Sequence, residues 1–179
     1  MINRIIDHIY ISDVEDVLGG CPLREHEITH VLTVSAVDVP ENQHVSNVKY
    51  HFVFVMDLPN FDILGGGQLS ECVAYINDAV QCNGNVLIHC EAGVSRSVTV
   101  VSAYIMQKLK LTVEEAIDIV KKSRPLACPN SGFFRQLQIY EQLHYKTDEY
   151  LLSQCCMYKD WSISPGGSTL KGSSNICVC

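Results

Sequence analysis

A strand, a loop and a helix that follow one another near the middle of the chain constrain its fold more than any other feature. The apolar run at residues 85–88 predicts a short buried strand, and the almost continuously apolar residues 98–109 predict a buried helix. The connection between them, residues 89–97, contains Gly93 and carries Cys90 near its start. A short glycine-containing loop between a strand and a helix is typical of folds that layer helices on a sheet.

The same alternation of strands and helices extends over most of the chain. Strands are predicted at residues 5–12, 30–35, 49–56 and 85–89. Helices are predicted at residues 22–27, 68–80, 98–109, 112–123 and 131–144. This order predicts an α/β fold with a central mixed, mostly parallel sheet flanked by helices. Because ligands bind at the carboxyl ends of strands in such sheets, we expect a site at residues 89–97.

The loop at residues 89–97 has the residues of an anion site that also holds a nucleophile. Backbone N–H groups at a helix N-terminus, with the positive end of the helix dipole behind them, attract anions. Arg96 follows Cys90 by six positions, and its planar guanidinium can hold two phosphoryl oxygens at once. Gly93 permits backbone angles that turn successive N–H groups inward. The helix terminus and Arg96 both favour the thiolate of Cys90, which is the nucleophilic form.

Ser97 and His89 flank this loop, and each has two interpretations. The Ser97 hydroxyl can donate to the sulfur of Cys90, or it caps the following helix, and the two roles are compatible. His89 orients the loop through a hydrogen bond to backbone, or it is a buried core histidine that holds the loop without titrating. Glu91, the first variable position of the loop, is expected to point outward.

The pattern H-C-x-x-G-x-x-R-S at residues 89–97 resembles the signature of the cysteine-dependent protein phosphatases, and its variable residues resemble the dual-specificity branch, in its small, atypical class. The resemblance implies a protein tyrosine phosphatase-like fold. It also implies a two-step reaction without metal or cofactor, in which Cys90 forms a phosphocysteine that water then hydrolyses. By the same resemblance, the phosphate is held by the loop residues Glu91, Ala92, Gly93, Val94, Ser95 and Arg96.

In that family an aspartate on an upstream loop, roughly thirty residues before the cysteine, carries the proton in both steps. Asp57 stands 33 positions before Cys90, directly after the predicted strand, and is the preferred candidate. Asp62 completes the family pattern D-x-x-x-x-D and is the reserve candidate. The alternative interpretation of Asp57 is a solvated turn residue, because aspartate favours turns before proline.

A third segment strengthens the resemblance. Residues 124–137 match the family pattern R-P-x-x-x-P-N-x-G-F-x-x-Q-L. Within it, Asn130 is predicted to cap a helix and to support the loop that carries Cys90. Phe133 and Leu137 are predicted to pack in the core.

The composition limits the class of protein and its surroundings. A length of 179 residues is that of one domain, and 47% hydrophobic residues are enough for a core. The net charge of −7 argues against nucleic acid or an anionic membrane surface as the main partner. The first residues lack a signal-peptide pattern, and no apolar stretch is long enough to span a bilayer. The nine cysteines therefore predict a reducing location, cytoplasmic or nuclear, rather than a disulfide framework.

The last part of the chain changes character. We predict a catalytic domain at residues 1–146 and a flexible tail at residues 147–179 that contains Ser, Gly and Cys. Lipidation is one alternative to a plain tail, because Cys177 and Cys179 resemble a geranylgeranylation end and the pair Cys155 and Cys156 suits palmitoylation. Zinc binding is a further alternative, but the cysteines lack the C-x₂-C spacing of structural sites.

The loop also bears on the substrate. Its variable positions are acidic, small or neutral, whereas the phosphoinositide phosphatases of the superfamily have a basic loop. We therefore predict a phosphoprotein substrate, with phosphotyrosine and phosphoserine or phosphothreonine both hydrolysed. The alternatives are a phosphatase of non-protein phosphate esters, a phosphoprotein-binding scaffold and a rhodanese-like sulfur carrier. The scaffold is disfavoured because Cys90, Arg96 and Asp57 are all present, and sulfur transfer would not need Asp57.

Overall fold

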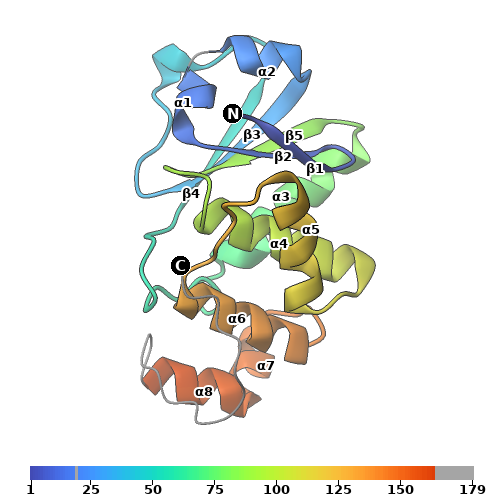
Figure 1. Cartoon of the computed structure of the whole chain (residues 1–179). Coiled ribbons are helices and arrows are strands. Elements are labelled where there is room, and N and C mark those ends of the chain that lie inside the picture. The colour runs from blue at the N-terminus through green and yellow to red at the C-terminus, as the bar shows by residue number, and fades with distance from the viewer. Residues whose placement is uncertain (19, 164–179) are drawn as a thin grey trace.

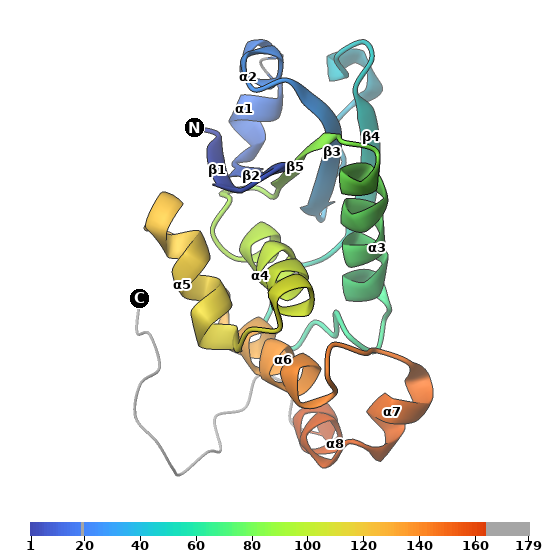
Figure 2. The ribbon, with the colours of Figure 1, turned by 90° about the vertical axis from the view of Figure 1, so that its right-hand side faces the viewer.

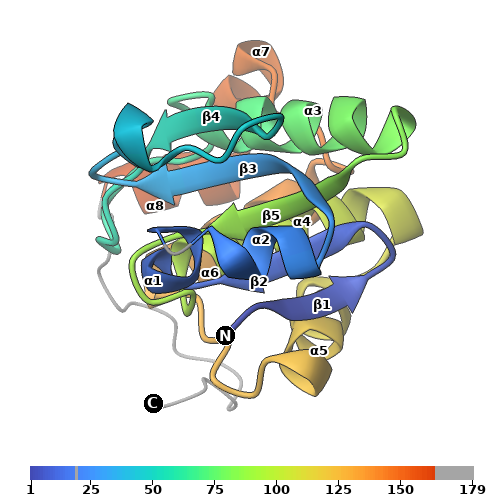
Figure 3. The ribbon, with the colours of Figure 1, turned by 90° about the horizontal axis from the view of Figure 1, so that it is seen from above.

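The computed structural model describes residues 1–18 and 20–163, and within them five strands form one sheet. Along the sheet the order is β1-β2-β5-β3-β4 (Figure 1, Figure 3). The strands are β1 (Asn3–Ile6), β2 (Ile9–Ser12), β3 (Ile28–Ser35), β4 (Lys49–Phe54) and β5 (Asn85–His89). β1 pairs antiparallel with β2, whereas the pairs β2–β5, β5–β3 and β3–β4 are parallel. The predicted mixed, mostly parallel sheet is confirmed.

Helices cover both faces of this sheet (Figure 2). The described helices are α1 (Val14–Leu18), α2 (Cys21–Glu25), α3 (Gln68–Gln81), α4 (Arg96–Leu109), α5 (Val113–Ser123), α6 (Ser131–Gln142), α7 (Glu149–Gln154) and α8 (Cys156–Ile163), with a 3-10 turn at Glu41–Gln43. α1 and α2 lie on one face, and α3, α4 and α5 lie on the other, with α6 next to them. α7 and α8 lie beyond α6, away from the sheet (Figure 1). Nowhere in the described chain is a helix both long enough and apolar enough to cross a membrane.

The strands contribute side chains to two hydrophobic cores, because successive side chains of a strand point to opposite faces of the sheet. In β5, Val86 and Ile88 belong to the larger core, which α3 to α6 cover, and Leu87 belongs to the smaller core, which α1 and α2 cover. All three side chains are fully buried, which explains why the sequence of the strand is a continuous apolar run. α4 is buried from Arg96 to Met106, as its composition predicts. The loop between β5 and α4 is therefore held at the centre of the molecule.

The helix ends follow the sequence signals. Thr112 and Glu115 form a capping box at the start of α5, in which the Thr112 N–H donates to the Glu115 carboxylate at 2.9 Å. Asn130 caps α6, and its Oδ1 accepts from the N–H of Phe133 at 2.9 Å. α5 ends just before Pro125, which cannot continue it. The helices predicted at 112–123 and 131–144 are thus confirmed within two residues.

Two N-terminal segments differ from the prediction. Residues 5–12 form not one strand but parts of a hairpin, in which β1 and β2 turn at Asp7 and His8. His8 has a φ of 67°, in the left-handed region where glycine is usual. Because the turn contains neither glycine nor proline, the sequence does not predict it. α1 is the other difference, since its five residues are too few for a periodic apolar pattern.

The prediction of a flexible tail from residue 147 is wrong as far as residue 163. Asp148 caps α7 through a hydrogen bond from the N–H of Leu151 at 3.0 Å, and α8 follows. Leu152, Cys155 and Trp161 are at most 7% exposed and join the larger core, which is why both helices pack on the domain. Residues 164–179, including Cys177 and Cys179, lie outside the described residues.

Candidate active site

Cys90 lies directly after β5, at the carboxyl edge of the sheet where a site is expected. Its side chain is buried. Sγ accepts a hydrogen bond from the N–H of Gly93 at 3.2 Å and lies 3.3 Å from Oγ of Ser97. Gly93 has a φ of 65°, which lets the loop fold back over the sulfur. The predicted contact between Ser97 and the sulfur is present.

Arg96 is the first residue of α4, and one of its buried donors makes no hydrogen bond to the described residues. Its side chain is buried, and Nη1 donates to Oγ of Ser35 at 3.2 Å and to the carbonyl of Val55 at 3.3 Å. Nε is also buried and has no hydrogen-bond partner among the described residues. Leaving such a donor unpaired costs free energy, so an anion that accepts from Nε would stabilise the site.

The backbone of the loop supplies further donors. Residues 91–95 form bends rather than hydrogen-bonded turns. Within the described residues, the N–H groups at positions 91, 92, 94 and 95 donate no hydrogen bond. They precede α4, whose 14 residues direct the positive end of their dipole to this point. These groups and Nε of Arg96 together give the loop the character of an anion site.

Arg124 holds this loop in shape, a role that its place in the R-P pattern does not reveal. It is 4% exposed. Its Nε donates to the carbonyl of Gly93 at 2.6 Å, and its Nη2 donates to the carbonyl of Ala92 at 3.1 Å. Nη1 donates to Oδ1 of Asn3 at 2.7 Å, which links the loop to β1. Arg124 thus fixes the carbonyls of Ala92 and Gly93, while the loop N–H groups that make no hydrogen bond to the described residues remain available to a ligand.

Asp57 lies three residues after β4, beside the loop of Cys90. Its Oδ1 accepts two hydrogen bonds of 2.7 Å, one from Oγ of Ser95 and one from Nδ2 of Asn130. Its Oδ2 lies 3.8 Å from Nε of Arg96, and the side chain is 35% exposed. The structure therefore brings together Cys90, Arg96 and Asp57, as the sequence predicts.

Asn130 and the start of α6 support this arrangement. The backbone N–H of Asn130 donates to Oγ of Ser95 at 3.1 Å, so Ser95 bridges Asn130 and Asp57. Two residues further on, a Cβ at Gly132 would lie 1.8 Å from the carbonyl oxygen of Pro59. Helix and loop approach this closely because position 132 has no side chain.

Asp62, the reserve candidate, is engaged elsewhere. Its Oδ1 accepts from the N–H groups of Leu64 and Gly65, at 3.1 and 2.7 Å. Its Oδ2 accepts from the Tyr158 hydroxyl of α8. No hydrogen bond joins Asp62 to the 89–97 loop in the described structure. The sequence pattern cannot reveal the contact with Tyr158, which is 96 residues away.

His89 behaves as the core histidine of the second interpretation. It is 1% exposed, and its Nε2 shares a hydrogen bond of 2.8 Å with Oγ1 of Thr33 in β3. Burial lowers the pKa of His89 to about 4, an effect that the backbone of Cys90 partly offsets. His89 is therefore neutral near pH 7 and joins β5 to β3 just before the nucleophile.

The variable positions of the loop form its rim. Glu91 and Ala92 are exposed, as expected for Glu91, and the carbonyl of Glu91 accepts from the N–H of Val14 at 3.2 Å. Val94 is half-buried. Ser95 is 6% exposed, and its hydroxyl turns inward to Asp57. Ser95 thus supports the carboxylate in addition to its predicted place in the loop.

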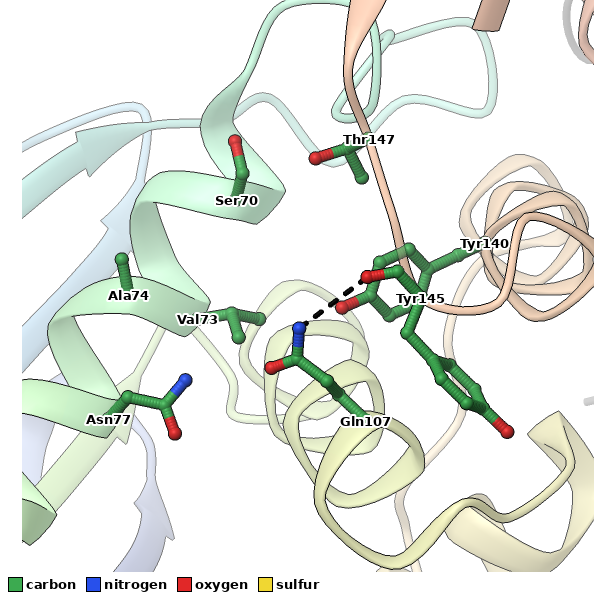
Figure 4. Close-up of a pocket in the computed structure, with 8 residues that line it drawn as sticks. All are labelled: Ser70, Val73, Ala74, Asn77, Gln107, Tyr140, Tyr145 and Thr147. Atoms are coloured by element: carbon green, nitrogen blue, oxygen red, sulfur yellow. Dashed lines mark hydrogen bonds between the residues drawn. The ribbon is translucent and has the colours of Figure 1, made fainter. Parts of the chain in front are cut away.

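A separate pocket of about 160 Å³ lies between α3, α4 and the end of α6 (Figure 4). Its lining includes Ser70 and Asn77 of α3 and Gln107 of α4, and Nε2 of Gln107 donates to the carbonyl of Tyr145 at 3.5 Å. None of the residues brought together around Cys90 lines it. The pocket is therefore distinct from the anion site.

The thiol lies at the carboxyl end of a strand, near backbone N–H groups that donate no hydrogen bond and near a carboxylate. This is the arrangement of a phosphatase that uses a cysteine nucleophile. A family model described as the catalytic domain of dual specificity phosphatases matches residues 9–143. The chain therefore belongs to the dual specificity phosphatase family, and protein phosphatase activity is its class of function.

Three known proteins show how closely the chain follows this family. Dual specificity protein phosphatase 1 of Arabidopsis thaliana is 37% identical over 142 residues, which are 79% of this chain and 70% of that protein. The crystal structure of the Yvh1 phosphatase domain from Chaetomium thermophilum has a TM-score of 0.75 at 29% identity and covers 83% of this chain and 100% of that one. The crystal structure of human DUSP28 has a TM-score of 0.72 at 30% identity, over 79% of this chain and 93% of that one. The resemblance thus includes small members of the family.

Proposed function

We propose that this chain hydrolyses phosphotyrosine and phosphoserine or phosphothreonine in proteins through a phosphocysteine at Cys90. In the first step the thiolate sulfur bonds to phosphorus, and the bond from phosphorus to the substrate's side-chain oxygen breaks. The phosphoryl oxygens accept from the loop N–H groups and from Nε of Arg96. That buried guanidinium donor, which makes no hydrogen bond to the described residues and lies 3.8 Å from the carboxylate of Asp57, is the observation that carries the proposal.

Asp57 carries the proton in both steps. It protonates the leaving oxygen in the first step. In the second it takes a proton from the water that attacks phosphorus, the S–P bond breaks, and inorganic phosphate and the thiolate are released. Ser97, whose Oγ lies 3.3 Å from the sulfur, donates to the departing thiolate.

The rim of the site supports a phosphoprotein as the substrate. The exposed loop residues are Glu91 and Ala92, and positions 91–95 include no lysine or arginine that would meet additional phosphates. The net charge of −7 weakens binding to nucleic acid or to an anionic lipid surface. Single phosphorylated side chains, rather than polyphosphorylated lipids, suit this rim.

A reducing compartment, cytoplasmic or nuclear, suits the cysteines of the chain. Cys21, Cys82 and Cys156 are exposed and are not in disulfides. Exposed thiols of this kind persist where glutathione keeps them reduced. The same compartment keeps Cys90 available as a nucleophile.

The test is hydrolysis of 4-nitrophenyl phosphate and of phosphotyrosine and phosphothreonine peptides, in the presence of a metal chelator. We expect wild-type protein to be active and Cys90→Ser to be inactive, because a hydroxyl is a far weaker nucleophile than a thiolate. Cys82→Ser, at an exposed cysteine outside the site, is the matched control and should retain activity.

Activity that survives in Cys90→Ser would exclude Cys90 as the nucleophile. Wild-type protein that binds phosphopeptides without turnover would instead establish the scaffold alternative. Turnover of phosphotyrosine peptides alone would restrict the proposal to one class of substrate.

A further inference from the structure

The acid loop, residues 55–67 between β4 and α3, carries two aspartates with different tasks. Asp57 lies near its start, beside the nucleophile. Asp62 lies in its middle and organises a turn, since its Oδ1 accepts from the N–H groups of Leu64 and Gly65 at 3.1 and 2.7 Å. The second oxygen of Asp62 is therefore free to bind something outside the loop.

That second oxygen binds the C-terminal helix. The hydroxyl of Tyr158, in α8, donates to Oδ2 of Asp62 at 2.5 Å. A Cβ at Gly65 would lie 2.0 Å from the same hydroxyl, so the loop backbone approaches Tyr158 where it has no side chain. Two features of the acid loop, a carboxylate and a glycine, thus accommodate one tyrosine hydroxyl.

The hydroxyl of Tyr158 is a stable donor. Burial raises the pKa of Tyr158, and the hydrogen bond and the negative charge of Asp62 raise it further. Tyr158 also stacks on Trp161, with ring centroids 6.1 Å apart, and Trp161 is 7% exposed in the larger core. The tyrosine is therefore fixed on α8, and α8 is fixed on the domain.

A continuous series of contacts joins this point to Asp57. Gln136 of α6 accepts from the N–H of Ile63 at 2.9 Å and donates to the carbonyl of Phe61 at 2.8 Å. The N–H of Phe61 donates to the carbonyl of Leu58 at 3.0 Å. Leu58 follows Asp57, so the anchored part of the acid loop reaches the catalytic carboxylate through backbone.

We propose that Tyr158 is a positioning residue, which holds the acid loop through Asp62 so that Asp57 is placed for proton transfer. The proposal rests on the proposed function, in which Asp57 is the proton carrier. α7 and α8 lie beyond residues 9–143, the part that matches the family model. They therefore add an anchor that the matched domain does not itself supply.

The experiment compares kcat for Tyr158→Phe with two substrates, phenyl phosphate and 4-nitrophenyl phosphate. The phenolate of the first is the more basic leaving group and needs a proton more. We expect Tyr158→Phe to lower kcat about fivefold with phenyl phosphate, to change it less than about twofold with 4-nitrophenyl phosphate, and to leave KM unchanged. Tyr150→Phe, on α7 and 72% exposed, is the matched control and should change neither rate.

A second variant tests whether Asp62 transmits the effect. Asp62→Ser keeps a short oxygen for the turn but cannot reach Tyr158. Adding Tyr158→Phe to Asp62→Ser should cause no further loss, because both remove the same contact. Losses that add, or an equal loss with both substrates, would overturn the proposal.

Asp57→Asn, measured in parallel, distinguishes a failure of the role of Asp57 from a failure of the role of Tyr158. If Asp57→Asn shows no dependence on the leaving group, the proposed role of Asp57 fails. If Asp57→Asn shows it and Tyr158→Phe does not, only the positioning role of Tyr158 fails. Circular dichroism and Trp161 fluorescence of each variant establish that α8 remains packed.

Discussion

The two oxygens of Asp57 have unequal surroundings. Oδ1 accepts from Ser95 and from Asn130, each at 2.7 Å. Oδ2 lies 3.8 Å from Nε of Arg96, beyond hydrogen-bond distance. A proton on the carboxyl group therefore belongs on Oδ2, the oxygen on the side of the anion site. The same geometry directs that proton to the leaving oxygen of a bound substrate.

Asp57→Asn should lower kcat about 10²-fold for phosphothreonine peptides and much less for 4-nitrophenyl phosphate. The alkoxide of threonine cannot leave without a proton, whereas nitrophenolate can. The measurement is kcat for both substrates with the same preparation. An equal loss with both would assign the proton to another group.

His89 should make the protein less stable in acid. Its pKa is about 4 in the folded protein, because it is buried, against the ordinary value of 6.5. Above pH 6.5 both states are neutral, and its contribution is fully present. As the pH falls from 6.5 to 4, the imidazole of His89 binds a proton in the unfolded state but not in the folded state. Unfolding free energy should therefore decrease by about 3 kcal/mol over that range.

Urea unfolding of wild type and His89→Gln between pH 7.5 and pH 4 measures this effect. The other groups that titrate in acid are common to both proteins, so the difference between the two pH profiles isolates His89. We expect the loss of stability to be smaller in His89→Gln. Parallel profiles would show that folding does not lower the pKa of His89.

At the scale of elements, apolar patterns predict the strands and helices that are buried on all sides. β5 is buried on both faces and α4 nearly all round, so each appears as an apolar run. The hairpin of β1 and β2 depends instead on the left-handed backbone of His8, which composition does not reveal. α8 has only eight residues, too few for a clear periodic apolar pattern, and its contacts with α6, α7 and Asp62 make it part of the domain.

The candidate site is predictable to a similar extent. Cys90, Arg96 and Asp57 stand at spacings that the strand order brings together. Arg124 and Tyr158 act on the site from other helices, and no local spacing signals a contact across 31 or 96 residues. Side chains that act on the site across such sequence distances can be identified only from the structure.

The start of α6 serves both the helix and the site, and one substitution should separate the two. In Asn130→Ser the hydroxyl can still accept from the N–H of Phe133, but the Nδ2 donor to Asp57 is lost. We expect an unchanged Tm and a several-fold lower kcat with phenyl phosphate. Asn130→Ala should lose both contacts and also about 1 kcal/mol of stability.

Calorimetry and steady-state kinetics on the two variants make this comparison. Equal Tm values for Asn130→Ser and Asn130→Ala would mean that the cap contributes nothing. Full activity in Asn130→Ser would mean that Ser95 alone holds Asp57.

At the scale of the whole molecule, one sheet serves two cores, and the C-terminal helices extend the larger one. Leu152 of α7 and Trp161 of α8 belong to the same cluster as Val86 and Ile88 of β5. A shared core predicts that these helices unfold with the sheet rather than before it. The domain therefore continues to residue 163.

Trp161 reports on this directly, because it is the one tryptophan of the sequence. We expect the urea transition followed by Trp161 fluorescence to coincide with that followed by far-ultraviolet circular dichroism, with one midpoint and one slope. Tyr158→Phe should shift both curves together. A fluorescence transition at lower urea would identify α8 as a separately unfolding unit.

The close approach of Gly132 to Pro59 bears on protein engineering. A side chain at position 132 would enter the space that the carbonyl oxygen of Pro59 occupies. The acid loop and the first turn of α6 are therefore a matched pair of surfaces. A chimera that takes this loop from a relative should retain its geometry only if the helix start is transplanted with it. Transplanting the loop with its geometry thus requires two segments, one around Pro59 and one around Gly132, which are 73 positions apart in the chain.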